Sequence, residues 1–125
     1  MQNLFAERRS VARIFVPSIA PADAARLLGQ SDVLFLDVRH ESEITAAGKI
    51  KGALNVSCEL LEYKADRNSF LHVPELVPDK TIIVYSAADN RSAVASATLK
   101  QMGFADVRNM GAFEGWKRGG GAVEI

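Results

Sequence analysis

The chain has 125 residues, a length that fits one domain. Hydrophobic residues make up 48% and charged residues 24%, which is a globular composition and excludes the disordered and fibrous classes. Lysine plus arginine and aspartate plus glutamate number 15 each, so the net charge gives no argument for a nucleic-acid or membrane partner.

Cys58 is the single cysteine, which excludes an internal disulfide and a cysteine-based metal site. A chain of this kind is expected in a reducing compartment, and we predict the cytoplasm. No apolar run reaches the length of a membrane span, and the first residues lack the apolar stretch of a secretory signal. His40 and His72 are too far apart to form a metal motif, so we expect no metal and no cofactor.

Residues 1–13 are predicted to form an N-terminal arm or short helix, and residues 14–125 the domain. Arg8, Arg9 and Arg13 outnumber Glu7 in this arm. The simple interpretation is an arm that leans on the domain, and the alternatives are an organellar presequence or a partner-binding helix.

The first half of the domain alternates strand and helix signals. The run at 13–19 is interrupted by Pro17, which allows an edge strand at best. Pro21 suits the start of a helix that Gly29 ends. The segment 32–39 is apolar on both faces, as in the middle of a parallel sheet, and a short helix at 41–47 and a strand at 53–56 follow.

The second half repeats this alternation after a mixed segment at 58–79 with one short helix near Leu60. Residues 81–86 form a second fully apolar strand. A helix follows from residue 91, with Val94, Thr98 and Met102 on one face and Gly103 as its stop. A strand at 105–110 and a short amphipathic segment complete the chain, and Phe113 and Trp116 are expected to be core residues.

This alternation predicts an α/β fold with a parallel sheet. Ligands of such sheets bind at the carboxyl ends of the strands. The strand ends that carry polar side chains here are Asp37-Val38-Arg39 and Tyr85-Ser86.

Four segments, in order from about Ile14, resemble the rhodanese-like (sulfurtransferase) family. "FLDVRHESEITAAGKIKGALNV" resembles the family's "LLDVRexxEYxxGHIPGAxNI", and "IIVYSAADNRSAVASATLKQMGF" resembles "vvvYCxxGxRSxxAAxxLxxxGF". "SIAPADAARLL" resembles the family's opening strand and helix, and "DVRNMGAFEGWKRGG" its closing segment. The resemblance implies a three-layer fold in which helices flank a five-stranded parallel sheet of order 3-2-4-5-1.

The resemblance also implies the site. The family's fourth strand ends at a cysteine that carries a persulfide, and Ser86 stands at that position here. The active-site loop would comprise Ala87, Ala88, Asp89, Asn90, Arg91 and Ser92. Asp37 and Arg39 follow the family's Asp-Val-Arg signature and would support the loop. A hydroxyl without a general base is a poor nucleophile and has no persulfide chemistry, so the family's reaction cannot run at Ser86.

The sequence departs from the family pattern at more than one place. Asp89 replaces the usual loop glycine, and "GKIKGA" at 48–53 lacks the histidine and proline of "GHIPGA". Several departures favour a naturally diverged site over one laboratory mutation. Asp89 is expected to fill the loop with its carboxylate or to cap the following helix. For Arg91 two roles stay open, binding of an anion or a salt bridge with Asp89 or Glu41.

The sequence is compatible with three alternative functions. The first is a non-catalytic module that binds a small anion or a protein partner at the former active-site face, which Arg39, Arg91, Lys49 and Lys51 would make locally basic. The second is an active thiosulfate-type sulfurtransferase whose catalytic cysteine was replaced by Ser86, which a cysteine codon in the gene would reveal. The third is a hydrolase using Ser86, His40 and Asp37.

A phosphatase is disfavoured by the length of the loop. Four residues lie between Ser86 and Arg91, one fewer than in the phosphatases that share the fold implied by the resemblance. Cys58 is expected to be a semi-buried structural thiol, with sulfur carriage as the alternative.

Overall fold

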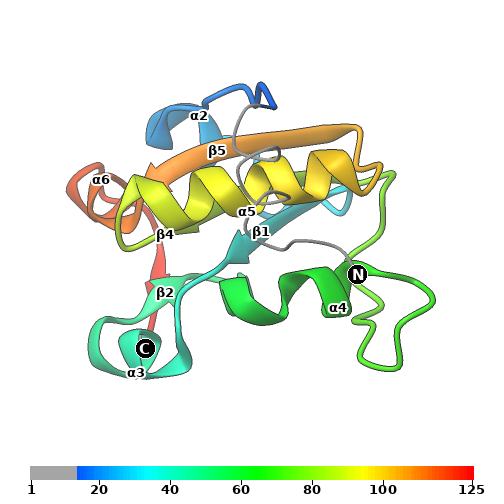
Figure 1. The fold of residues 1–125 in the computed structure, drawn as a ribbon. Coiled ribbons are helices and arrows are strands. Elements are labelled where there is room, and N and C mark those ends of the chain that lie inside the picture. Colours follow the sequence, from blue (N-terminus) through cyan, green and yellow to red (C-terminus); the bar gives the residue numbers. More distant parts are fainter. Residues whose placement is uncertain (1–13) are drawn as a thin grey trace.

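The computed structural model describes residues 14–125, so the prediction of an N-terminal arm at 1–13 lies outside the described residues. Four parallel strands form the central sheet in the order β3-β1-β4-β5 (Figure 1). The strands are β1 (Val33–Asp37), β3 (Leu54–Asn55), β4 (Thr81–Ser86) and β5 (Asp106–Ala112). The predicted α/β fold with a parallel sheet is therefore confirmed.

The fifth strand expected at the start of the domain is reduced to a single bridge. Ser18 pairs with Asn109 of β5 in the parallel sense, next to hydrogen bonds from Ile19 N to Asn109 O and from Asn109 N to Pro17 O. Pro17 has no amide hydrogen to donate, so a longer ladder is not possible there. The sheet thus has four strands rather than five, although this segment lies at the edge where the order 3-2-4-5-1 placed the first strand.

Helices cover both faces of the sheet and give the expected three layers. On one face, α4 (Leu61–Ala65) and α5 (Asp89–Gln101) enclose a core with buried side chains from Leu36, Val84 and Leu99 (Figure 1). On the other face, α2 (Pro21–Ala25) and α6 (Phe113–Arg118) cover a second core. Phe113 and Trp116 belong to this second core, which confirms their predicted role.

The remaining elements lie between these layers or at their edge. They are α3 (Glu41–Ala47), the 3-10 turn η1 (Cys58–Leu60) before α4, and an antiparallel pair of β2 (Lys49–Ile50) with β6 (Val123–Glu124). The sequence did not predict this pair, because two residues are too few to show a strand periodicity. None of the helices between residues 14 and 125 has the length and apolarity needed to cross a membrane.

The helix α5 differs from its prediction in its start and in its buried face. It begins at Asp89 instead of residue 91, and its small residues and Leu99 face the core. Val94 and Thr98, which were expected to form the apolar face, are only half-buried. Gly103 has a φ of 104°, the left-handed conformation expected of a helix stop.

Candidate functional site

The site predicted from the sequence lies at the carboxyl ends of β1 and β4, which pair in register from Val33 and Thr81 to Asp37 and Tyr85. Ser86 is the last residue of β4 and is fully buried. Its hydroxyl donates a hydrogen bond to Ala88 O and accepts one from Ser92 N at 3.2 Å. The Ser86 hydroxyl is therefore satisfied by its own loop.

The loop after Ser86 is shorter than the family pattern implies. Ala87 and Ala88 are its only residues before α5 begins, and Ala88 is the extended N-cap. Asp89, Asn90 and Arg91 already belong to the first turn of the helix. No residue other than glycine has a positive φ among the described residues, so Asp89 does not reproduce a glycine-type turn.

The sequence predicted that the carboxylate of Asp89 could cap α5, and this prediction is wrong. The helix has no side-chain cap at its N-terminus, and Asp89 Oδ1 instead accepts a hydrogen bond from Asn109 Nδ2 at 2.9 Å. The same oxygen lies over Gly111, where an added Cβ would come within 3.1 Å. The N-cap position, from which a side chain bonds the N2 or N3 amide, is occupied by Ala88, and Asp89 stands one residue later and faces β5.

Arg91 forms an ion pair, but with neither predicted partner. Its two terminal nitrogens donate to the two carboxylate oxygens of Glu43 on α3, at 2.6 and 2.8 Å. The bidentate pair with Arg91 lowers the pKa of Glu43 to about 2. Glu43 stands three residues after His40, the capping-box spacing, which is a signal visible in the sequence, and its carboxylate accepts from His40 N.

Asp37 and Arg39 form a buried ion pair that supports the strand end. Arg39 donates to Asp37 through Nε and Nη2, with the shortest distance 2.6 Å, and Nη2 also donates to Gly48 O at 2.7 Å. Burial disfavours the charged guanidinium, but the contacts with Asp37 outweigh it and raise the pKa of Arg39. Its guanidinium carbon lies 4.5 Å from the Phe113 ring centroid. Through Arg39, the pair ties the end of β1 to Gly48.

Asn55 and Tyr85, the second of which stands at a predicted strand end, complete this support. Asn55 Nδ2 donates to Asp37 O and Arg39 O, at 3.0 and 2.9 Å. The Tyr85 hydroxyl accepts from Ile50 N at 3.0 Å, and burial followed by the nearby Asp37 carboxylate raises its pKa. Asn55 is the asparagine of the quoted "GALNV" motif, so the resemblance contained this signal.

The expected basic face does not form from the four predicted cations. Arg39 is buried on Asp37, and Arg91 is neutralised by Glu43. Lys49 Nζ donates to Ala53 O at 2.6 Å, and Lys51 lines a different cavity together with Leu28. The cations predicted to attract an anion are thus paired within the domain or lie elsewhere.

The two histidines have other partners than a catalytic site at Ser86 requires. His40 Nε2 lies 3.3 Å from Glu59 Oε1, and His72 Nε2 lies 3.2 Å from Leu76 O. His40 is therefore not a partner of Ser86. Cys58 is half-buried and shares a cavity with Arg91. Within residues 14–125, no group of three histidine, cysteine, aspartate or glutamate side chains could hold a metal ion.

Comparison with known proteins shows the family. A model of the rhodanese-like domain matches residues 20–119. A sulfurtransferase of Allochromatium vinosum is 32% identical over 96 residues, which cover 76% of this chain and 81% of that protein.

Two solved structures resemble the whole fold. A Rhodopseudomonas palustris protein, described as of unknown function and a possible tyrosine phosphatase, is 31% identical with a TM-score of 0.83, over 99% of this chain and 96% of that one. A rhodanese-related protein of Thermoplasma volcanium is 30% identical with a TM-score of 0.70, over 86% of this chain and 97% of that one. The chain therefore belongs to the rhodanese-like domain family and is a distant homologue of a sulfurtransferase.

Proposed function

We propose that this rhodanese-like domain does not transfer sulfur and acts as a binding module at the former active-site face. The observation that carries the proposal is the state of Ser86, which is buried and hydrogen-bonded to Ala88 and Ser92 of its own loop. Sulfur transfer requires an accessible thiolate surrounded by amide donors. A buried hydroxyl with its hydrogen bonds already made meets neither requirement.

The surroundings of Ser86 support the same conclusion. Because α5 starts at Asp89, the backbone of residues 89–91 is helical and does not form an open loop around an incoming anion. Arg91, the residue that would bind such an anion, is held by Glu43. Several residues have thus changed together, which favours natural divergence over a single replaced cysteine.

The alternative enzymatic functions receive less support. A hydrolase would need a general base within hydrogen-bond reach of Ser86, and His40 lies against Glu59 instead. A tyrosine phosphatase, the description of one similar structure, would need a thiolate and an open phosphate loop. Ser86 and its two-residue connection to α5, Ala87 and Ala88, supply neither.

The test is a thiosulfate-to-cyanide sulfur-transfer assay on the natural chain beside Ser86→Cys and Ser86→Cys/Asp89→Gly. We expect no turnover by the natural chain and none by Ser86→Cys alone, because the new thiol would still face a loop closed by α5. The double variant removes the side chain that ties the start of α5 to Asn109. Turnover that appears only in this variant would show that two features prevent sulfur transfer, the missing thiol at position 86 and the start of α5 at Asp89.

Cys58→Ser is the control, because it removes the only natural thiol. Each protein is assayed with and without this substitution. Turnover by the natural chain, whether or not it depends on Cys58, would refute the proposal. Full activity of Ser86→Cys would support the second function, a sulfurtransferase whose catalytic cysteine was replaced by Ser86, in place of ours.

A further inference from the structure

A groove between α4 and α5 lies beside the candidate site and shares Arg91 with it. We call it the α4–α5 groove and define it by Glu59, Leu61, Glu62, Tyr63, Val94 and Thr98. Its volume is about 290 Å³. Figure 1 shows the two helices next to each other on the same face of the sheet. The groove is thus a surface feature between two packed helices.

The groove combines an apolar base with an exposed aromatic wall. Leu61 is buried at its base, and Val94 and Thr98 of α5 are half-buried along one side. Tyr63 is 58% exposed and forms the opposite side. The helix α5 directs Leu99 and its small residues into the core, so Val94 and Thr98 remain available on the surface.

The charges at its rim are acidic. Glu59 and Glu62 are both exposed, and Glu59 lies 3.3 Å from the His40 imidazole and close enough to Arg91 to help raise the pKa of that guanidinium. Arg91 also lines the cavity, but Glu43 balances its charge. A segment that combines apolar and basic side chains would complement this surface, whereas a phosphate group, a nucleic acid or an anionic membrane would meet repulsion.

We propose that the α4–α5 groove binds a segment of a partner protein in which an apolar side chain lies next to lysine or arginine. The apolar side chain would pack between Tyr63 and Val94, and the cation would lie against Glu59 and Glu62. The volume lies just below the range of typical small-molecule pockets, about 300–1,000 Å³, and favours one or two side chains of a peptide. This inference goes beyond the proposed function, because the groove lies beside the former active-site face and not on it.

The test uses fluorescence anisotropy with a labelled peptide of leucine, alanine and arginine, and a matched peptide with glutamate for every arginine. We expect the arginine peptide to bind and the glutamate peptide not to bind. Glu59→Gln/Glu62→Gln should weaken binding about tenfold at low ionic strength, since rim charges add modestly to affinity. Glu75→Gln, at an exposed glutamate of the 66–80 loop outside the groove, is the matched control and should change nothing.

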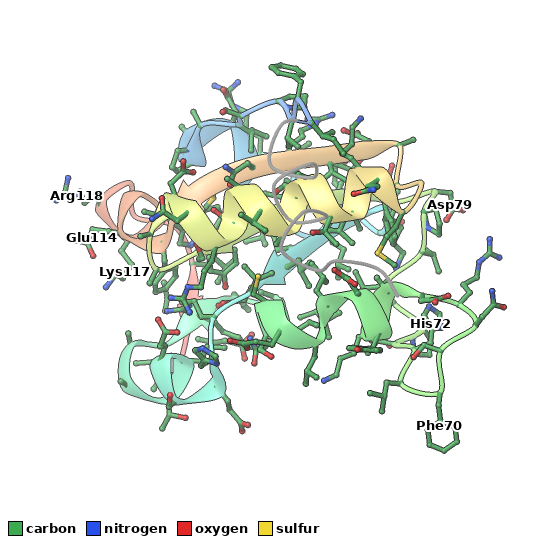
Figure 2. The ribbon with its side chains drawn as sticks, in the orientation of Figure 1. Phe70, His72, Asp79, Glu114, Lys117 and Arg118 are labelled. Carbon is green, nitrogen blue, oxygen red and sulfur yellow. The ribbon has the colours of Figure 1, made fainter. Side chains whose placement is uncertain are left out.

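A second pair of variants tests the apolar part. Tyr63→Ala should weaken binding at any salt concentration, while Phe70→Ala should not, because Phe70 is a fully exposed aromatic residue that points away from the domain at the tip of the same loop (Figure 2). Both residues are exposed, so neither variant threatens folding. Amide shifts on adding the peptide, followed by NMR, should concentrate at residues 59–63 and 94–98.

Equal binding of the two peptides, affinity unchanged in Glu59→Gln/Glu62→Gln, or amide shifts centred on another face would overturn the proposal. None of these results bears on sulfur transfer, which the Ser86→Cys series measures separately. Failure of the groove proposal and failure of the proposed function can therefore be told apart.

Discussion

Arg39 and Arg108 share the local sequence Asp-Val-Arg but lie in opposite surroundings. Both pair with the aspartate two residues earlier, Asp37 and Asp106 respectively. The first pair is buried, while the side chains of the second are 36% and 43% exposed. At the scale of the residue, the same three letters thus form a core ion pair in one place and a surface ion pair in the other.

Replacing Arg39 by methionine should lower the free energy of unfolding by about 3–5 kcal/mol, because it leaves the Asp37 carboxylate buried without a counter-charge. Arg108→Met is the matched control and should cost less than about 1 kcal/mol, as expected of an exposed pair. Urea denaturation at neutral pH measures both. Similar losses in the two variants would contradict the structural role assigned to Arg39.

The pair of Glu43 and Arg91 predicts a pH dependence. The pKa of Glu43 is lowered from 4.5 to about 2, so the folded state favours the ionised form more than the unfolded chain does. Its contribution to stability is present above pH 4.5 and is lost as the pH falls towards 2. Both side chains are about one third exposed, and solvent screening limits the contribution to about 1 kcal/mol.

Titration of the Glu43 carboxyl carbon by NMR checks this directly. We expect a midpoint near 2 in the natural chain, and a midpoint shifted upwards, towards 4.5, in Arg91→Gln. The stability difference between Glu43→Gln and the natural chain should shrink as the pH falls from 4.5 to 2. A midpoint near 4.5 in the natural chain would show that the ion pair does not form in solution.

At the scale of the element, the segments with strong patterns were predictable and the short ones were not. The apolar run of β4 and the stop of α5 at Gly103 follow from local sequence. The start of α5 does not, because Ala87 and Ala88 carry no cap signal and the resemblance suggested a longer loop. The partners of Asp89 and Arg91 come from β5 and α3, segments distant in sequence, so only the tertiary structure could supply them.

Gly48 shows how one residue joins three elements. It ends α3 with φ 79° and ψ −177°, a region that residues with side chains rarely adopt, and its carbonyl accepts from Arg39. A Cβ at Gly48 would lie 2.9 Å from Glu124 O and 3.0 Å from Val123 Cγ1 of β6. Any side chain there would strain the backbone and displace β6.

Gly48→Ala should therefore destabilise the domain more than Gly29→Ala does. Gly29 also has a positive φ, 88°, but an added Cβ would meet nothing within 4 Å. The Gly29 variant should cost about 1–2 kcal/mol from backbone strain alone, and the Gly48 variant clearly more. Urea midpoints of the two variants give the comparison. Equal losses would mean that β6 does not pack on Gly48.

At the scale of the whole molecule, the four-stranded sheet separates two cores that share its strands. Alternate residues of β4 enter opposite cores, since Ile82 and Val84 belong to one and Ile83 and Tyr85 to the other. If β4 left the sheet, apolar side chains of both cores would be exposed to solvent. The sequence predicted this arrangement through continuous apolar strands, which are typical of sheets buried on both faces.

Leu99→Ala tests whether the two cores unfold together. Leu99 is fully buried on the α4 and α5 face, so truncating it should lower the free energy of unfolding by about 2–5 kcal/mol. Trp116, the only tryptophan, lies in the core on the opposite face. Its fluorescence should nevertheless shift to lower urea by the same amount as the far-UV circular dichroism, because the shared strands make unfolding cooperative. A Trp116 transition that stays in place while the dichroism moves would mean that the two faces unfold independently.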